Sequence, residues 1–465
     1  MTLGQKALLI LICLISCGLL VTAPSAISAA SVETSLSVKS LVIKDSIQAT
    51  VPANAKWSFA AVDVDTHRQL SDEGNSKNFP LTPGSLVKLF ITAAIFDMNS
   101  REQVSLDTFF SHDGNVADKE LKGSIYIKGS GNAFLSKGDI SKAVDAIISR
   151  DITQIAGDII IDDTLFELNE WKPKHYGPAY STPSPLGLDM HTVSITISGS
   201  PPDLKIDPPN DLVKVITSLN GKPDILQIDD LTYSISGFTG SIPMKKRFPL
   251  KNPSLYLAQT FKTLLRENNI TFKGTIRNGK TPSGASLMYA AKSKSLEEIV
   301  KDINNHSLNV LSENLLLILG AKKYGPPGTI EKGSLALKEF LNNIGLSSEE
   351  IIIADGSGLS PLNRISANHI VSFLTKISEK PWFNSFYESL PRVGMEGTLK
   401  GIAYTNDHIR AKTGQLDDVY CLAGYIEKKD GKKVAFSYMV NVPGADLLWK
   451  ENKEIFMLLS RIVDE

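Results

Sequence analysis

Apolar and polar residues near the start of the chain predict one strand followed by one helix. Residues 57–64 alternate with the two-residue period of a half-buried strand. Residues 82–95 then carry apolar side chains at helical spacing, after the helix-opening pair Thr82-Pro83. Ser85 is therefore expected in the first turn, at the positive end of the helix dipole, with Lys88 one turn later on the same side.

The C-terminal part of the chain predicts a hairpin between helices. Residues 422–427 and 434–442 are two apolar runs on either side of the turn dipeptide Asp430-Gly431, which is the pattern of an antiparallel hairpin. The two ends of the chain thus predict an α/β fold in which helices flank an antiparallel sheet. The flanking helical patterns are residues 366–377, where Ser366 is placed as a cap, and residues 447–463.

The chain between about residue 105 and about residue 290 has a different pattern. Short β-rich runs at 124–128, 158–162 and 193–198 are separated by clusters of glycine and proline. We interpret this segment as an inserted β-rich unit with its own core. The predicted organisation is a main domain formed by residues 30–104 and 291–465, interrupted by an insertion at 105–290.

The first residues have the layout of an export signal. Lys6 precedes an apolar run over 7–21, and small residues gather around 26–30. We expect residues 1–29 to be removed and the mature chain to be exported, to the periplasm or to the outer face of the cytoplasmic membrane. Two alternatives stay open: the run is a membrane anchor, or Cys17 is a lipid attachment site.

Composition narrows the class of protein. With 465 residues, 42% hydrophobic and 21% charged, the chain can bury the cores of about two or three domains. A formal net charge of −1 and the absence of a basic patch in the sequence argue against a nucleic-acid-binding protein. Cys13 and Cys17 lie in the signal, which leaves Cys421 without a disulfide partner. Its apolar surroundings predict a buried strand cysteine rather than a nucleophile.

Three short strings in a fixed order carry the candidate chemistry: Ser85-Leu86-Val87-Lys88, Ser307-Leu308-Asn309 and Lys412-Thr413-Gly414. Taken singly, each has an ordinary structural explanation, as a helix start, a helix-entry turn and a strand end. Their order matches the serine, lysine and asparagine constellation of penicillin-recognising acyl transferases. Two longer strings accompany them, Asp-Gly-Ser-Gly-Leu-Ser at 355–360 and Gly-Met-Glu-Gly-Thr-Leu at 394–399. For residues 355–360 we expect a mainly structural role, with glycines where the backbone requires them.

Together these strings resemble the D-alanyl-D-alanine carboxypeptidase/endopeptidase family of low-molecular-mass class C penicillin-binding proteins, over nearly the whole mature chain. The long gap between Ser85 and Ser307 fits this family, which carries an insertion there. The resemblance implies a β-lactamase/transpeptidase-like domain with a β-rich insertion, acting as a serine-type D-Ala-D-Ala carboxypeptidase or DD-endopeptidase. Peptidoglycan stem peptides would be its substrates, β-lactams would inhibit it, and no metal or cofactor is implied.

The residue types suit acyl transfer. A serine hydroxyl is a weak nucleophile at neutral pH, so a base must take its proton. Lys88 can do so if burial and the charge of Lys412 keep its amine partly neutral. The resemblance assigns the remaining roles. Ser307 would pass a proton to the leaving amine, and Asn309 would hold the substrate amide and orient Lys88. The substrate carboxylate would be bound by Lys412 and Thr413, and the backbone N–H groups of Ser85 and Gln415 would form the oxyanion hole, with Gly414 beside them in the substrate-binding strand.

Several positions depart from the family pattern. Gly84 and Leu308 replace the usual alanine and aspartate without changing a reacting atom. Gln415 stands where serine or threonine usually helps to bind the terminal carboxylate. Pro361 stands where arginine often contacts the stem peptide, and the sequence leaves open whether Arg364 reaches that place. The candidate stem-peptide contacts are Asp162, Asp163, Phe166 and Asp417, with Asp418 adding charge beside the last. A simple surface turn is an equal alternative for the first three.

These departures predict that recognition of the third residue of the stem peptide differs from the family norm. Two other functions remain as alternatives: a β-lactamase or esterase on the same scaffold, and a cell-wall-binding protein whose site has lost activity. The sequence does not determine the oligomeric state or the balance between carboxypeptidase and endopeptidase action.

Overall fold

The structure, a computed structural model of the 465-residue chain, describes residue 48 and residues 51–463 apart from 78, 169–179, 219, 241, 403 and 446–452. The expected signal at 1–29, with Cys17, lies outside the described residues, as does the start of the helix predicted at 447–463. Over the described part of the chain, no helix is both long enough and apolar enough to cross a bilayer.

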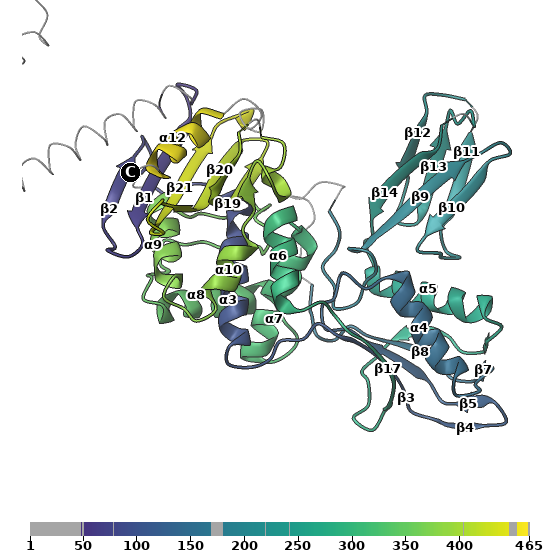
Figure 1. Cartoon of the computed structure of the whole chain (residues 1–465). Coiled ribbons are helices and arrows are strands. Elements are labelled where there is room, and N and C mark those ends of the chain that lie inside the picture. The colour runs from purple at the N-terminus through teal and green to yellow at the C-terminus, as the bar shows by residue number, and fades with distance from the viewer. Residues whose placement is uncertain are drawn as a thin grey trace, which may run out of the picture.

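Six strands form one antiparallel sheet in the order β18-β19-β20-β21-β1-β2 (Figure 1). The predicted hairpin is confirmed, because β20 and β21 pair with Leu422 opposite Tyr438. The predicted N-terminal strand is also confirmed, and it pairs with the other edge of β21, where Phe59 faces Tyr438. The bounds are β1 Lys56–Asp63, β2 Gln69–Glu73, β18 Arg392–Val393, β19 Asn406–Leu416, β20 Val419–Glu427 and β21 Lys433–Asn441.

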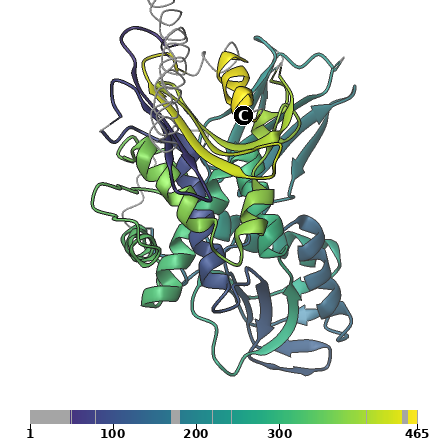
Figure 2. The same cartoon turned by 60° about the vertical axis from the view of Figure 1, so that its left-hand side comes forward.

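Helices cover both faces of this sheet (Figures 1 and 2). Successive strand residues point to opposite faces, so Cys421 and Tyr425 of β20 join one core while Tyr420 and Leu422 join the other. α12 (Lys453–Val463) packs on the second core, and six other helices pack on the first. These are α3 Val87–Asn99, α6 Leu296–His306, α7 Asn309–Tyr324, α8 Ile330–Asn343, α9 Ala367–Ile377 and α10 Phe383–Ser389.

Two of these helices are central. Every residue of α3 from Val87 to Phe96 is buried, and so is every residue of α7 from Val310 to Ala321. Neither stretch has a strongly polar face, as expected of helices buried on all sides, and Lys88 and Glu313 are their charged residues. α9 is a surface helix by contrast, and its predicted cap is confirmed because Ser366 accepts a hydrogen bond from the backbone N–H of His369.

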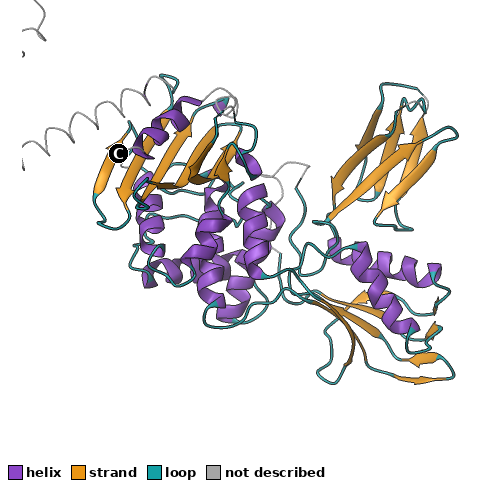
Figure 3. Ribbon diagram, in the orientation of Figure 1, coloured by secondary structure: helices purple, strands orange, loops and turns teal. Residues whose placement is uncertain are grey.

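The chain between α3 and α6 forms several further sheets beside the main body (Figures 1 and 3). Two sheets, β16-β8-β6-β3-β17 and β15-β7-β5-β4, enclose one core together with two helices. Two three-stranded sheets, β10-β9-β14 and β11-β13-β12, enclose another. The bounds are β3 Thr108–His112, β4 Asn115–Ala117, β5 Glu120–Lys122, β6 Ile125–Lys128, β7 Gln154–Ile155, β8 Ile159–Asp162, β9 Thr192–Ser198, β10 Asp203–Asp207, β11 Lys214–Ser218, β12 Asp224–Gln227, β13 Thr232–Ser236, β14 Met244–Pro249, β15 Thr271–Phe272, β16 Ile276–Asn278 and β17 Ser286–Ala291.

The two helices of this segment, α4 (Lys137–Ile148) and α5 (Pro253–Glu267), were not part of the expectation of a β-rich unit. Signals for α4 are present in the sequence. Ser136 and Asp139 form a capping box, and the buried residues Ile140, Val144 and Ile147 follow at helical spacing. The β-rich prediction was therefore incomplete for this segment.

Candidate active site

Ser85 lies in a short 3-10 turn, η1 (Gly84–Leu86), which leads directly into α3. Its expected position at the start of a helix is confirmed, with a first turn tighter than an α-turn. The residue is 8% exposed, so only a small part of it can meet a ligand. Strand β19 runs close to η1, because a Cβ atom on Gly414 would lie 2.3 Å from the carbonyl oxygen of Pro83. Glycine at position 414 permits this close approach.

Lys88 is completely buried and connects the first motif to the second. Its Nζ lies 2.8 Å from the hydroxyl oxygen of Ser85 and 2.9 Å from Oδ1 of Asn309. It also contacts the carbonyl oxygen of Ser357. Burial lowers the pKa of Lys88 to about 7, and the negative charges of Asp355 and Glu313 oppose that shift. The amine is therefore partly neutral near physiological pH.

The second motif is the junction between α6 and α7. Ser307 ends α6 in the left-handed conformation, with φ of 55°, and Asn309 is the first residue of α7. The ordinary interpretation as a helix-entry turn is correct. The same sharp turn brings both side chains to the site, since Asn309 reaches Lys88 and Ser307 reaches the third motif.

The third motif lies on β19. Lys412 is completely buried, and its Nζ donates to the hydroxyl of Ser307 at 3.0 Å and to the carbonyl of Thr413 at 2.9 Å. Burial holds the pKa of Lys412 well below its ordinary value, and the charge of Lys88 lowers it further. The hydroxyl of Thr413 lies 2.9 Å from that of Thr398, in the short turn η3 (Gly397–Leu399).

Gln415 follows on the same strand with an exposed side chain. Its backbone nitrogen lies close to η1, since a Cβ atom on Gly84 would be 3.1 Å from it. The backbone groups of Ser85 and Gln415 therefore belong to neighbouring segments, although β19 and η1 are far apart in the sequence. This neighbourhood is what an oxyanion hole built from two backbone N–H groups requires.

The loop at 355–360 contributes to the site as well as to its framework. The carbonyl oxygen of Ser357 accepts hydrogen bonds from the hydroxyl of Ser85, at 3.3 Å, and from Lys88. Sequence reasoning gave no role to this backbone group, to Glu313 or to Thr398. A signal for Glu313 was available, because it is a single acidic residue within the apolar run of α7.

The predicted stem-peptide contacts have varied surroundings. Asp162 is buried and accepts hydrogen bonds from Thr164 and Thr281, and Asp163 accepts from Asn278. Phe166 belongs to the hydrophobic core that also contains Ile318 of α7. Asp417 and Asp418 are exposed in the turn that joins β19 to β20. Arg364 donates a hydrogen bond to the Thr82 hydroxyl at 3.0 Å, three residues before Ser85.

Cys421 is fully buried in β20, as predicted, and its Sγ lies 3.7 Å from the carbonyl oxygen of Thr82. Burial raises the pKa of this thiol well above its ordinary value, so it is a poor nucleophile.

No three histidine, cysteine, aspartate or glutamate side chains are grouped so that they could hold a metal ion in the part of the chain that the structure describes. The two carboxylates nearest to Lys88 have other partners. Glu313 accepts two backbone N–H groups, and Asp355 accepts two backbone N–H groups together with the side chains of Ser357 and Asn363.

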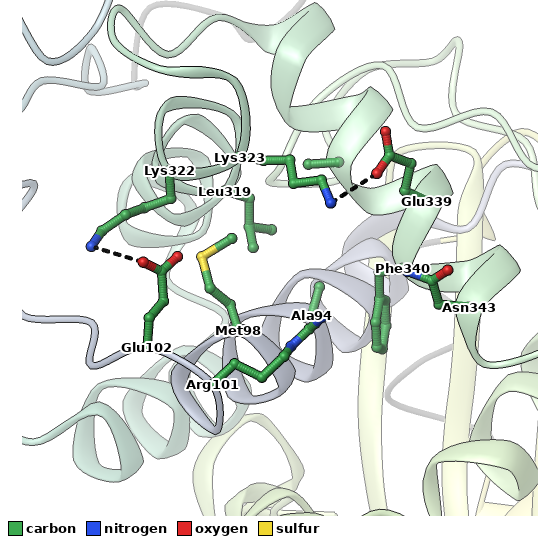
Figure 4. A pocket seen from close by; sticks show the side chains of 11 residues that line it. Ala94, Met98, Arg101, Glu102, Leu319, Lys322, Lys323, Glu339, Phe340 and Asn343 are labelled. Atoms are coloured by element: carbon green, nitrogen blue, oxygen red, sulfur yellow. Dashed lines mark ion pairs between the residues drawn. The ribbon is translucent and has the colours of Figure 1, made fainter.

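A separate hollow lies beside α8, at the C-terminal ends of α3 and α7, whereas the first two motifs lie at their N-terminal ends (Figure 4). Its volume is about 260 Å³, and its floor includes Met98, Leu319 and Phe340. Charged side chains at its edge pair with one another, Lys322 with Glu102 at 3.7 Å and Lys323 with Glu339 at 3.0 Å. None of the motif residues lines it, so it is distinct from the candidate active site.

An antiparallel sheet with helices on both faces is the β-lactamase/transpeptidase-like fold. In this chain the fold brings a serine and two lysines together between η1, α7 and β19. Residues 42–460 match the D-Ala-D-Ala carboxypeptidase 3 (S13) family, and the chain belongs to this family.

Characterised relatives agree with this assignment. The chain is 24% identical to the D-alanyl-D-alanine carboxypeptidase DacB of Haemophilus influenzae, over 84% of this chain and 86% of that protein. It is 25% identical to a D-alanyl-D-alanine carboxypeptidase of Actinomadura sp. strain R39, over 82% of this chain and 76% of that one. The crystal structure of penicillin-binding protein 4 (dacB) of H. influenzae, complexed with a β-lactam, has the same fold, with a TM-score of 0.72, 22% identity, and coverage of 90% of this chain and 99% of that chain.

Proposed function

We propose that this protein is a serine DD-peptidase that hydrolyses D-alanyl-D-alanine ends or cross-links of peptidoglycan through an acyl-enzyme on Ser85. The observation that carries the proposal is the 2.8 Å contact between the buried amine of Lys88 and the hydroxyl of Ser85. Membership in the D-Ala-D-Ala carboxypeptidase family supports the substrate class. Carboxypeptidase and endopeptidase action use the same acyl-enzyme and differ only in the leaving amine.

Lys88 acts as the base. A neutral amine has two N–H donors and one lone pair, and Lys88 has three neighbours: Asn309 Oδ1, the Ser357 carbonyl and the Ser85 hydroxyl. The first two are acceptors, so they take the two N–H groups and leave the lone pair directed at Ser85. The Ser85 hydroxyl, which donates to the Ser357 carbonyl in this structure, turns its hydrogen to that lone pair. The proton passes to Lys88 Nζ as Ser85 Oγ attacks the carbonyl carbon of the scissile peptide bond.

The leaving amine then needs a proton. Because Lys412 donates to Ser307 Oγ, the hydrogen of the Ser307 hydroxyl can be directed at the bound substrate. Ser307 passes that proton to the departing nitrogen as the C–N bond breaks, and the proton that Lys88 took from Ser85 replaces it on Ser307. The acyl group is then left on Ser85, with Lys88 neutral again. Water later attacks the ester carbonyl while Lys88 Nζ takes its proton, and that proton passes to Ser85 Oγ as the bond between the acyl group and Ser85 breaks, which restores the starting state.

Lys412 and Thr413 meet the terminal carboxylate of the substrate. An isolated buried amine tends to be neutral, but a bound carboxylate favours its charged form, so substrate binding restores the positive charge of Lys412. The Thr413 hydroxyl adds a hydrogen bond to the carboxylate. The backbone N–H groups of Ser85 and Gln415 stabilise the oxyanion, a role in which the Gln415 side chain takes no part.

We also propose that recognition of the third stem-peptide residue differs from the family norm. Asp417 and Asp418 add exposed negative charge in the turn that follows Gln415. Pro361 stands at the position where the family often has an arginine. Asp162, Asp163 and Phe166 remain candidate contacts. Cleavage rates for amidated, unamidated and lysine-containing stem peptides test this, and equal rates on all three would contradict it.

The chain organisation that accompanies this function has residues 30–104 and 291–465 as the catalytic domain and 105–290 as the insertion. The separate hydrophobic cores of the segment between α3 and α6 support that division. Cleavage of residues 1–29 and export to the periplasm, or to the outer face of the cytoplasmic membrane, would place the site at its substrate. N-terminal sequencing of the secreted protein tests the cleavage.

Intact-protein mass after mixing with benzylpenicillin tests the proposed function, with Ser85→Ala as the control. A stable adduct on the wild type alone is the expected result. If neither protein gains mass and the antibiotic survives, the chain is a cell-wall-binding protein without this activity. If no adduct forms and the antibiotic is destroyed, the chain is a β-lactamase.

A further inference from the structure

Four charged side chains are buried together at the motif residues. Lys88, Lys412 and Asp355 are 0% exposed, and Glu313 is 1% exposed. The sequence assigns roles to the two lysines, but it assigns none to Glu313. Glu313 lies on α7 four residues after Asn309, so the two side chains leave the helix on the same side. A buried carboxylate in this position needs a reason, because burying a charge is costly unless it is paired and hydrogen-bonded.

Glu313 binds the backbone of the loop at 355–360. Oε2 accepts a hydrogen bond from the N–H of Gly356 at 2.9 Å, and Oε1 accepts one from the N–H of Ser357 at 3.0 Å. A second tether comes from the preceding residue of α7, since the hydroxyl of Ser312 donates to the carbonyl of Gly356 at 2.6 Å. The loop also packs directly on α7, as a Cβ atom on Gly356 would lie 2.6 Å from the Ser312 carbonyl oxygen.

These tethers orient one carbonyl group. The Ser357 carbonyl belongs to the peptide group whose N–H, on Gly358, donates to Asp355 at 2.9 Å. The N–H of Ser357 itself donates to Glu313. With the N–H groups on both sides directed at carboxylates, the carbonyl points the other way, where it accepts from Lys88 and Ser85. Hydrogen bonds to charged acceptors are stronger than neutral ones, so this orientation is well held.

We propose that Glu313 is a positioning residue for the base. It holds the Ser357 carbonyl against Lys88, so that the lone pair of Lys88 faces Ser85, and it places a negative charge beside the amine. This inference rests on the proposed function, because it assigns a role within the acylation of Ser85.

The charge of Glu313 has a consequence for pH dependence. The charged groups around Lys88 are Asp355 on the loop, Glu313 on α7 and Lys412 on β19. Asp355 and Glu313 both raise the pKa of Lys88 against the larger, lowering effect of burial. Burial and the repulsion from Asp355 in turn raise the pKa of Glu313 to about 7. Removal of the Glu313 charge therefore lowers the pKa of Lys88. The acidic limb of the pH–rate profile, where the acylation rate falls as Lys88 becomes protonated, then moves to lower pH.

The test is the second-order rate constant for acylation by a fluorescent penicillin, measured from about pH 5 to about pH 9, together with the melting temperature of each variant. Glu313→Gln keeps the length of the side chain but loses the charge and one acceptor. We expect its plateau rate to fall about tenfold or more and its acidic limb to move to lower pH. Glu313→Asp keeps the charge and shortens the reach, so its plateau falls while its limb stays close to that of the wild type.

Two further variants complete the comparison. Ser312→Ala removes the neutral tether to the same loop, so its plateau falls and its limb does not move. Glu339→Gln, on α8 with a side chain that is 40% exposed, is the matched control and changes neither quantity.

A folded Glu313→Gln that acylates at the wild-type rate with an unmoved limb overturns the proposal. A lower plateau without a shifted limb also overturns it, since that leaves a purely structural role. If Glu313→Gln does not fold, Glu313→Asp decides the matter, and an unchanged plateau there is the contradicting result. A wild type that is never acylated overturns the proposed function itself, and with it this role, whereas the outcomes above contradict Glu313 alone.

Discussion

The amine of Lys412 donates a hydrogen bond of 3.0 Å to the hydroxyl of Ser307, which lies 105 residues earlier in the chain. Lys88 and Asn309 form a second such link, 2.9 Å long, between residues separated by 221 positions. The two links attach the third motif to the second and the second to the first. Ser85, Lys88 and Asn309 thus form one hydrogen-bonded group and Ser307 and Lys412 another, and the short turn 307–309 joins the two.

The Lys412–Ser307 link leads to a prediction about proton transfer. Ser307→Ala removes the group that protonates the leaving amine, so kcat/KM on a D-alanyl-D-alanine peptide should fall by about 10²-fold or more. The melting temperature should change little, because the substitution removes one oxygen. Ser347→Ala, on an exposed loop, is the control and should retain full activity. Retention of peptide turnover by Ser307→Ala would assign the proton to another donor.

The buried amine of Lys88 predicts how acylation depends on pH. With a pKa of about 7, Lys88 is protonated and inactive as a base below that pH and neutral above it, so the rate should increase as the pH rises through about 7. Lys88→Arg keeps a cation that does not deprotonate, and its acylation should be slower by about 10²-fold or more across this range. Lys128→Arg, exposed on β6, is the control. The comparison uses stopped-flow acylation, and a wild-type rate that is flat with pH would contradict the assignment.

The surroundings of Gly358 predict that one added methyl group, in Gly358→Ala, strongly lowers stability and acylation. The φ of Gly358 is +84°, and a Cβ atom there would lie 2.1 Å from the carbonyl oxygen of Gly84 and 2.9 Å from the nitrogen of Ser85. Gly431 has nearly the same φ, +83°, with open space around it. Gly431→Ala should therefore cost only the left-handed strain of about 1 kcal/mol, and Gly358→Ala roughly 3 kcal/mol or more, with loss of acylation. Urea unfolding of both variants measures the difference, and equal losses would mean that η1 moves aside freely.

Two neighbours on β19 should differ in their effect on substrate binding. Thr413→Val removes a buried hydroxyl that faces Thr398, and kcat/KM for a substrate with a free carboxylate should fall by roughly tenfold or more. Gln415→Ala should change it by less than about threefold, since its expected contribution comes from the backbone. Steady-state kinetics on one peptide compare the two. A larger loss for Gln415→Ala would show that its side chain binds the carboxylate.

The thiol of Cys421 should be unreactive in the folded protein. It is fully buried and its pKa is raised, so little thiolate forms and reagents cannot reach it. A colorimetric thiol reagent should label the mature chain only after unfolding in denaturant. Rapid labelling of the native chain would place Cys421 in an accessible site.

The sequence alone determined the features that depend on near neighbours. The cap at Ser366 needs only the following turn, and the β20–β21 hairpin needs two apolar runs and a short turn. The motif strings also identified Ser85, Lys88, Ser307, Asn309 and Lys412, and the structure brings these five together, whereas their roles in the reaction remain predictions.

Tertiary structure decided what depends on contacts between distant segments. β1 pairs with β21 across almost the whole described chain, and no local pattern encodes that partner. The Ser357 carbonyl has no side chain that would reveal it, and it reaches Lys88 only because Glu313 and Asp355 hold the adjoining N–H groups. The hydrogen bond between Thr398 and Thr413 likewise joins two strings that appear unrelated in the sequence. Local propensity acts over a few residues, whereas the position of a buried polar group is determined by the partners that the complete fold supplies.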